Sequence, residues 1–107
     1  MSTAYLTLAA RLEANSIAAP NGCKTWTGNT NNSGYARYSV RCGSQIKKVY
    51  SHRSAWEIEH EQEIPAGFEI DHTCTNPLCI APAHLELVTG AENLRRAASR
   101  RAARTVH

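Results

Sequence analysis

The stretch EIDHTCTNPLCIAPAHLELVTGAEN, residues 69 to 93, contains two histidines, two cysteines, an aspartate and two asparagines within 25 positions. Cys74, Cys79 and His84 follow one another with four residues in each gap. Thiolate and imidazole are ligands that zinc prefers, and a closed structural site has four ligands in a tetrahedral arrangement. The spacing therefore predicts that these three residues and a fourth ligand bind one zinc ion.

The identity of the fourth ligand decides what the segment does. Three candidates are present, namely His72 within the segment and Cys23 or Cys42 upstream. If His72 binds the zinc, the segment is only a structural knuckle. If an upstream cysteine completes the site, His72 is left free beside the metal and can do chemistry. Asn76, which precedes Pro77, is predicted to be a turn residue that shapes the loop.

The length and composition predict one small domain over residues 1–107, near the lower limit for a single apolar core. Domains of this size often gain stability from a bound metal. The N-terminus does not resemble a secretory signal, so we expect a reducing, cytoplasmic compartment that favours thiolate ligands over disulfides. No segment approaches the length of a membrane span, and no membrane partner is predicted.

The charges are distributed unevenly, although the formal net charge is only +3. Six of the nine acidic residues lie between positions 57 and 71, whereas residues 95–107 contain five arginines and no acidic residue. Two interpretations of this basic tail are open. It is either a solvated surface, or an arm whose arginines bind phosphates and release counterions from a nucleic acid.

Apolar periodicity and turn residues predict an α+β fold. The expected helices are 3–15, 52–62 and 90–103, and the expected strands are 23–27, 35–40, 46–51, 68–72 and 85–89. The first three strands are expected to form a small antiparallel meander. Thr89 and Glu92 fit a capping box at the start of the last helix. Trp26 and Trp56 are expected in the core.

These motifs resemble those of the HNH endonucleases. DHTCTNPLCIAPAHLELVTGAEN is similar to phage and intron-type members, and to the related His-Cys box homing endonucleases. Upstream, GCKTWTG, SGYARYSV and VYSHRSAWE resemble further signals of the same group, in the same order. The resemblance covers about residues 22–94. It implies a ββα-metal core at about 67–104 with a structural zinc and, for a phage-encoded chain, a location in the host cell cytoplasm.

The resemblance also implies roles for the polar residues of this core. His72 is expected to be the general base, with His52 and Arg53 as a supporting pair near the site. Asp71 and Asn93 are expected to hold the catalytic divalent cation, Mg²⁺ or another ion.

The zinc site is completed through the same resemblance. In zinc-bearing relatives a cysteine from an earlier strand closes the site, which implies Cys23 as the partner of Cys74, Cys79 and His84. Cys42 lies in a CGSQ turn and is interpreted as a surface thiol.

Elementary chemistry agrees with these roles. A neutral imidazole removes a proton from water near pH 7, because its unperturbed pKa is about 6.5. Mg²⁺ prefers hard oxygen ligands, keeps several waters and binds substrate phosphate. One geometric difficulty is present. Adjacent strand residues point to opposite faces, so Asp71 and His72 can serve one site only at a strand end or a bulge.

Cationic and aromatic residues are predicted to contact double-stranded DNA. A β-ribbon can enter the major groove, and arginines of the last helix can follow phosphates. By resemblance, Arg37 is the strand arginine that reaches the scissile phosphate. The predicted DNA-binding residues are Tyr35, Arg41, Lys47, Lys48, Arg53, Arg95, Arg96 and Arg100, with Tyr38 beside them.

The sequence therefore predicts a metal-dependent HNH endonuclease that hydrolyses DNA phosphodiester bonds. The alternative is a non-catalytic DNA-binding module stabilised by zinc. The joint presence of His72 and Asn93 favours the nuclease, because a pure binder needs no such pair. A zinc nucleobase deaminase is excluded, since its Cys-x-x-Cys pair is absent. One site cuts one strand, so double-strand cleavage requires a homodimer or a second visit.

Overall fold

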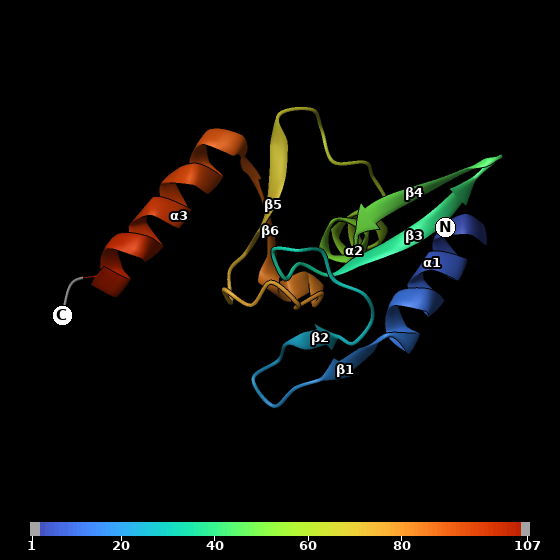
Figure 1. Cartoon of the computed structure of the whole chain (residues 1–107), viewed down its shortest axis with the longest axis horizontal. Helices are drawn as coiled ribbons and strands as arrows, with labels where there is room; N and C mark the ends of the chain where they lie inside the picture. The colour runs from blue at the N-terminus through green and yellow to red at the C-terminus, as the bar shows by residue number, and fades with distance from the viewer. Residues whose placement is uncertain (1–2, 106–107) are drawn as a thin grey trace.

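The computed structural model describes the backbone of residues 3–105 and the side chains of residues 8–41 and 43–103 (Figure 1). The helices are α1 (Thr3–Ala14), α2 (Ser51–His60), the 3₁₀ helix η1 (Pro82–His84) and α3 (Gly90–Thr105), and the strands are β1 (Ser16–Ala18), β2 (Lys24–Trp26), β3 (Arg37–Cys42), β4 (Gln45–Tyr50), β5 (Phe68–His72) and β6 (Leu85–Thr89). This content confirms the predicted α+β class. None of the described helices has the length and apolar character that crossing a bilayer requires.

The strands form three separate antiparallel pairs, β1–β2, β3–β4 and β5–β6. The strands expected in the first half are present, but β2 pairs with β1, which the sequence patterns did not indicate. The connection of residues 27–36 turns on itself, because the Asn31 side chain accepts hydrogen bonds from the N–H groups of Ser33 and Tyr35. The expected meander is therefore divided into two hairpins.

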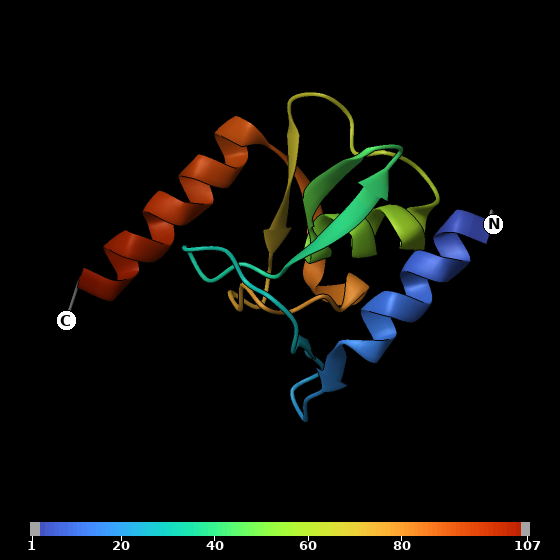
Figure 2. The ribbon, with the colours of Figure 1, turned by 45° about the vertical axis from the view of Figure 1, so that its right-hand side comes forward.

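An apolar core joins α1, α2 and the β5–β6 pair. Trp26 and Trp56 are both buried in it, as predicted, together with Tyr38, Ile70 and Leu85. Figure 2 shows α2 between α1 and the β5–β6 pair, and contacts along both sides of α2 agree with this placement. The packing holds the first turn of α2 close to the end of β5.

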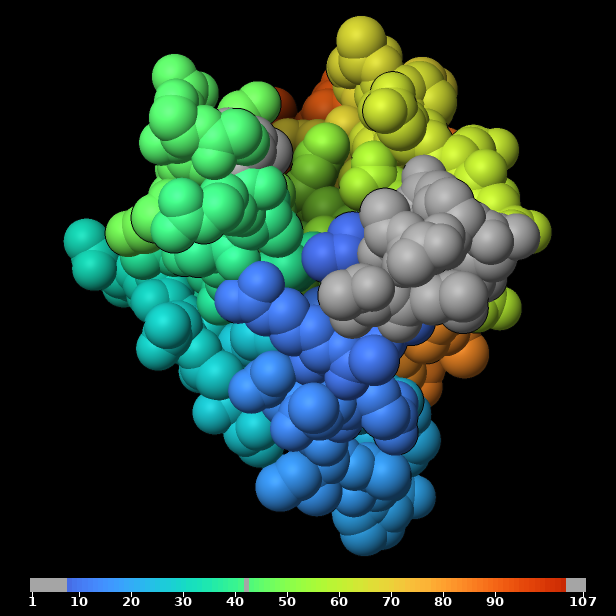
Figure 3. Space-filling view, turned by 90° about the vertical axis from the view of Figure 1, so that its right-hand side faces the viewer, coloured from blue at the N-terminus to red at the C-terminus, as the bar shows by residue number. Residues whose placement is uncertain are grey.

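The β3–β4 hairpin extends from this core, and α1 lies against it (Figure 3). Arg11 of α1 maintains the contact. Its guanidinium group donates to the Ser39 carbonyl at 2.6 Å and lies over the Tyr38 ring, 4.9 Å from the ring centroid. α1 therefore contacts the hairpin through Arg11.

The second half of the chain follows the predicted boundaries closely. The observed bounds of β5 and β6 are those expected, whereas α2 ends two residues early, at His60, and α3 continues to Thr105. The Glu92 N–H donates to Thr89 Oγ1 at 3.1 Å, so Thr89 caps α3 as predicted. The Glu92 carboxylate pairs with arginines of α3. The β5–β6–α3 unit is thus the predicted ββα arrangement.

Candidate metal centre and nuclease site

Four side chains that suit zinc lie together where the β5–η1 loop meets β2. Cys23, Cys74, Cys79 and His84 each offer a ligand atom, and these atoms all lie within 4.8 Å of one another. His84 Nδ1 is 3.4 Å from Cys23 Sγ and 3.5 Å from Cys79 Sγ. Three thiols and one imidazole form a ligand set of structural zinc sites. We call these residues the Cys3His group, and His72 lies outside it.

Backbone contacts bring Cys23 to this loop from a distant part of the sequence. The Ile80 N–H donates to the Lys24 carbonyl at 2.8 Å, so the start of β2 runs beside the loop. The Asn21 side chain accepts a hydrogen bond from the Cys23 N–H at 3.0 Å and fixes the turn before β2. Cys23 is thus the fourth member of the Cys3His group. The Cys42 side chain lies outside the described residues.

Asn76 shapes the loop between Cys74 and Cys79, as predicted. Its Oδ1 accepts a hydrogen bond from the Leu78 N–H and its carbonyl accepts one from the Cys79 N–H, both at 3.0 Å. Burial raises the pKa of the Cys79 thiol to about 11, so a thiolate at this position requires a nearby positive charge. A zinc ion supplies such a charge, and the Cys3His group is compatible with zinc binding.

His72 is the last residue of β5 and lies beside the Cys3His group. Its Nε2 is buried and has no hydrogen-bond partner among the described protein groups. Burial lowers the pKa of His72, and the Cys79 backbone opposes this shift. The imidazole is therefore neutral near pH 7 and can accept a proton.

Aromatic rings surround His72. His52, in the first turn of α2, lies 4.5 Å from it between ring centroids, and Tyr35 lies 6.1 Å from it. Tyr50, which the sequence did not single out, lies 5.7 Å from the His52 ring. Burial, followed by the charge of His72, lowers the pKa of His52 to about 3, so this ring stays neutral. His52 therefore lies beside the predicted base, as the resemblance implied, and Tyr35, which was predicted to contact DNA, lies beside it as well.

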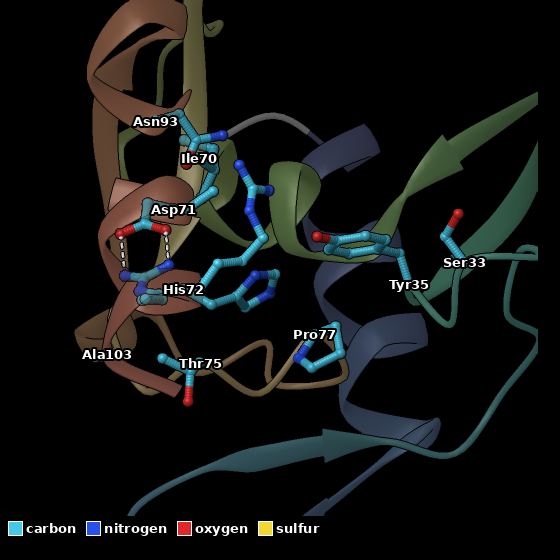
Figure 4. Close-up of a pocket in the computed structure, with 12 residues that line it drawn as sticks. Ser33, Tyr35, Ile70, Asp71, His72, Thr75, Pro77, Asn93 and Ala103 are labelled. Atoms are coloured by element: carbon cyan, nitrogen blue, oxygen red, sulfur yellow. Dashed lines mark hydrogen bonds and ion pairs between the residues drawn. The ribbon is translucent and has the colours of Figure 1, made fainter. Parts of the chain in front are cut away.

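A pocket of about 620 Å³ opens beside His72 (Figure 4). Asp71, Asn93 and Tyr35 line it together with His72, so the predicted base and both predicted cation ligands share one cavity. In Figure 4 the His72 and Tyr35 rings approach the cavity from different elements, whereas Asp71 turns towards an arginine. Arg101 of α3 also lines the pocket.

Asp71 and His72 point to opposite faces of β5, as the alternation of strand side chains requires. Asp71 faces α3, where Arg100 donates to both of its carboxylate oxygens at 2.9 Å and Arg96 donates to Oδ2 at 3.0 Å. The Arg100 hydrogen bonds are the main cause that lowers the pKa of this buried carboxyl group. The charge of Asp71 is thus already balanced within the chain.

Asn93 lies in the first turn of α3, as predicted. Its Nδ2 donates to Glu69 Oε2 at 2.9 Å. This orientation leaves Oδ1 as the atom that can accept from water or bind a hard cation. The sequence analysis missed Glu69, although its position two residues before Asp71 places both carboxylates on the same face of β5.

The predicted DNA-binding residues of the β3–β4 hairpin divide between its two faces. The strand register places Arg37, Arg41 and Lys48 on one face, whereas Lys47 pairs with Val40 on the other face. Arg37 does not line the His72 pocket and lies instead in a second, smaller depression with Lys48. None of these four cations has an acidic partner among the residues that the structure describes.

Most of the predicted DNA-binding arginines of α3 form ion pairs. Arg95, Arg96 and Arg100 all pair with carboxylates of β5, β6 or α3 itself. Arg101 has no acidic partner within the described ranges, and neither has the half-buried Arg53 of α2. The unpaired positive charge therefore lies on the β3–β4 hairpin and at the pocket. Sequence analysis did not separate Arg101 from its neighbours.

Comparisons with known proteins agree with the arrangement of these elements. A family model described as HNH endonuclease matches residues 49–95, from the end of β4 to the first turns of α3. Protein 2.8 of Escherichia phage T7 is 41% identical over 73 residues, which are 68% of this chain and 47% of the T7 protein. An uncharacterized gene 5.3 protein of Enterobacteria phage T3 is 35% identical over 78 residues, 70% of this chain and 76% of the T3 protein.

The chain thus spans about half the length of the T7 relative and three quarters of the T3 relative. No solved structure matches it. The family match includes α2, the β5–η1 loop with Cys74 and Cys79, and the ββα unit with His72 and Asn93. This match and the phage relatives show that the chain belongs to the HNH endonuclease family.

Proposed function

We propose that the chain is a metal-dependent endonuclease that hydrolyses phosphodiester bonds of double-stranded DNA, with residues 1–107 as one nuclease domain. One observation carries the proposal. His84 belongs to the Cys3His group, whereas His72 stays outside it and lines the pocket together with Asn93. Membership of the HNH endonuclease family supports a role in binding or cutting nucleic acid.

The Cys3His group is assigned a structural Zn²⁺. The ion would tie the β5–η1 loop to β2, because Cys23 and the other ligands come from these two segments. The Thr75 N–H donates to the His72 carbonyl at 3.0 Å, so the loop that carries Cys74 also holds the end of β5 and the base on it. A bound zinc ion would thus stabilise the fold and the position of His72 without taking part in the reaction.

The neutral His72 imidazole takes a proton from the attacking water while the water oxygen forms a bond to phosphorus and the leaving oxygen departs. Asn93 Oδ1 suits a divalent cation such as Mg²⁺, which accepts few protein ligands. When bound, the cation supplies positive charge to the phosphate and the leaving oxygen. Asp71 fits as a second ligand only if it exchanges Arg96 and Arg100 for the ion.

Arg101 is assigned the role of stabilising the negative charge of the reacting phosphate. It lines the same pocket as His72 and has no carboxylate partner among the described residues, so its guanidinium group is available to phosphate oxygens. Arg37, which the family resemblance implied for this role, lies in the neighbouring depression. His52 contacts the His72 ring and is assigned a positioning role.

The phage relatives favour a location in the host cell cytoplasm. A single chain has one such pocket in its described part and would nick one strand. A homodimer would present two sites and allow cleavage of both strands.

Plasmid nicking in the presence of Mg²⁺ tests the proposal. His72→Ala is expected to abolish nicking while bound zinc and DNA affinity are retained. His60→Ala is the matched control, because His60 is exposed at the end of α2 and stacks on Trp56. It should nick at the wild-type rate. Equal nicking by His72→Ala and the wild type would overturn the nuclease assignment.

The alternative is a non-catalytic DNA-binding module stabilised by zinc. The pairing of Asp71 with two arginines favours it, because a carboxylate held in this way is a poor cation ligand. Under this alternative, the wild-type protein binds zinc and DNA but nicks no plasmid with either Mg²⁺ or Mn²⁺.

A further inference from the structure

A second depression, of about 150 Å³, lies on the face of the β3–β4 hairpin that carries Arg37 and Lys48. It is lined by Asn29, Thr30, Arg37, Tyr38, Ser39 and Lys48. Two cations and three hydroxyl-bearing residues thus line one hollow, and none of the described residues that line it is acidic. The Tyr38 hydroxyl already donates to Ser54, so Thr30 and Ser39 supply the available hydroxyl groups. Neither cation forms an ion pair within the described chain. This combination suits an anion with several acceptor oxygens.

The backbone around the depression is firmly held. The Asn29 carbonyl accepts hydrogen bonds from the Arg37 N–H at 2.9 Å and from Trp26 Nε1 at 2.8 Å. Trp26 is buried, so this carbonyl is anchored to the core. On the strand itself, the Ser39 carbonyl accepts a hydrogen bond from Arg11. A site on a rigid scaffold loses little conformational freedom when it binds a ligand.

The depression lies next to the His72 pocket along the chain. Tyr35 lines the pocket and Arg37 lines the depression, so only Ala36 separates them, and the two residue steps span about 6 to 7 Å of extended chain. The register adds a second connection, because Arg37 pairs with Tyr50, whose ring contacts both Tyr35 and His52. An extended polyanion in the pocket would therefore continue towards the depression.

We infer that this depression binds one phosphodiester group of DNA, beside the phosphate held in the His72 pocket. The identity of the ligand as DNA rests on the proposed function. Arg37 and Lys48 supply the charge, and Thr30 and Ser39 supply hydroxyl donors. The contact positions the strand on the protein and reads no base.

Binding of a duplex oligonucleotide by His72→Ala protein, without added Mg²⁺, tests the inference independently of cleavage. Combining Arg37→Met with Lys48→Met is expected to reduce the slope of log affinity against log salt concentration by about 0.9, the value for one phosphate contact. Lys47→Met is the single-charge control. The sequence predicted Lys47 to bind DNA, but the strand register turns it to the face opposite the depression, so its loss should leave the slope unchanged.

A set of duplexes that each carry one uncharged methylphosphonate linkage locates the contact. Protein that keeps Arg37 and Lys48 is expected to bind more weakly when the uncharged linkage lies at one position beside the cut position. The Arg37→Met and Lys48→Met combination should be insensitive at that linkage, while Lys47→Met keeps the sensitivity. Circular dichroism and zinc content establish that all variants are folded.

The inference is overturned if the double variant keeps the wild-type pattern, or if Lys47→Met changes the slope by the same amount. Failure of the proposed nuclease function has a different signature. In that case no plasmid is nicked. The wild-type residues still make binding sensitive to one methylphosphonate linkage, and the double variant is still insensitive there. A protein that binds no duplex at all removes both proposals.

Discussion

The imidazole rings of His52 and His72 lie 4.5 Å apart between their centroids, at an angle of 48°, although one belongs to α2 and the other to β5. Both side chains are buried, and His52 Nδ1 and His72 Nε2 have no hydrogen-bond partner among the described protein groups. A proton on either ring would be opposed by burial and would repel a proton on the other ring. The pair therefore favours the neutral, base-competent form of His72.

The stability of the folded protein should depend on pH through His52. Its pKa is about 3 in the folded state, against about 6.5 in an unfolded chain. Between these two pKa values the unfolded chain binds a proton at His52 that the folded chain does not. The contribution of neutral His52 to the unfolding free energy is therefore fully present above pH 6.5 and is lost as the pH falls towards 3, by up to about 1.4 kcal/mol per pH unit. His52→Asn is expected to flatten the dependence of the unfolding free energy on pH. Urea unfolding between about pH 7 and 5 measures it.

Ile80→Val is the control for this pH series, since Ile80 is buried and does not titrate. It should lower the unfolding free energy by about 1 kcal/mol at every pH and keep the wild-type slope. A His52→Asn protein with the wild-type slope would contradict the prediction.

The pairing of Asp71 with Arg100 and Arg96 should fasten α3 to β5. Asp71→Asn removes the charge and keeps the side-chain shape, and it is expected to lower the unfolding free energy by about 2 kcal/mol. This is less than the cost of breaking a fully buried pair, because the Arg100 side chain is 35% exposed. Arg95→Met, at an exposed pair with Glu92, should cost less than about 0.5 kcal/mol. Equal effects of the two changes would refute a special role for Asp71.

The amount of bound zinc should distinguish the roles of the two upstream cysteines, Cys23 and Cys42. Cys23→Ser removes one member of the Cys3His group and is expected to reduce bound zinc well below about one ion per chain, with a large loss of thermal stability. Cys42→Ser should keep wild-type zinc. Elemental analysis of the purified proteins measures both. The reverse pattern would show that Cys42 is the fourth ligand.

Arg101 should affect the reaction more than it affects binding. Arg101→Met is expected to lower the rate of plasmid nicking about 100-fold, the effect of losing one donor to the transition-state charge. Its effect on DNA affinity should stay below about tenfold, because one phosphate contact among several is lost. Arg95→Met, on the same helix but paired with Glu92, is the control and should nick normally. An equal loss of nicking rate in both variants would indicate that Arg101 acts only by general attraction of DNA to positive charge.

The ββα unit could be predicted because its signals are local. β5 and β6 are short segments bounded by turn residues, and Thr89 marks the start of α3 through a contact three residues away. The β1–β2 pairing was missed, because β1 has only three residues and the position of its partner β2 depends on the β5–η1 loop packed against it. Short strands carry little periodicity, so tertiary contacts decide their pairing.

By itself, the sequence determined the α+β class, three members of the Cys3His group, and the placement of His72 at the end of β5 and of Asn93 in the first turn of α3. These features depend on spacing within a few residues, which local backbone geometry translates directly into position. Only the tertiary structure brought Cys23 to the Cys3His group, paired Asp71 with Arg100, and placed Arg37 beside Lys48. Such contacts join distant segments, and the packing of the whole chain selects them.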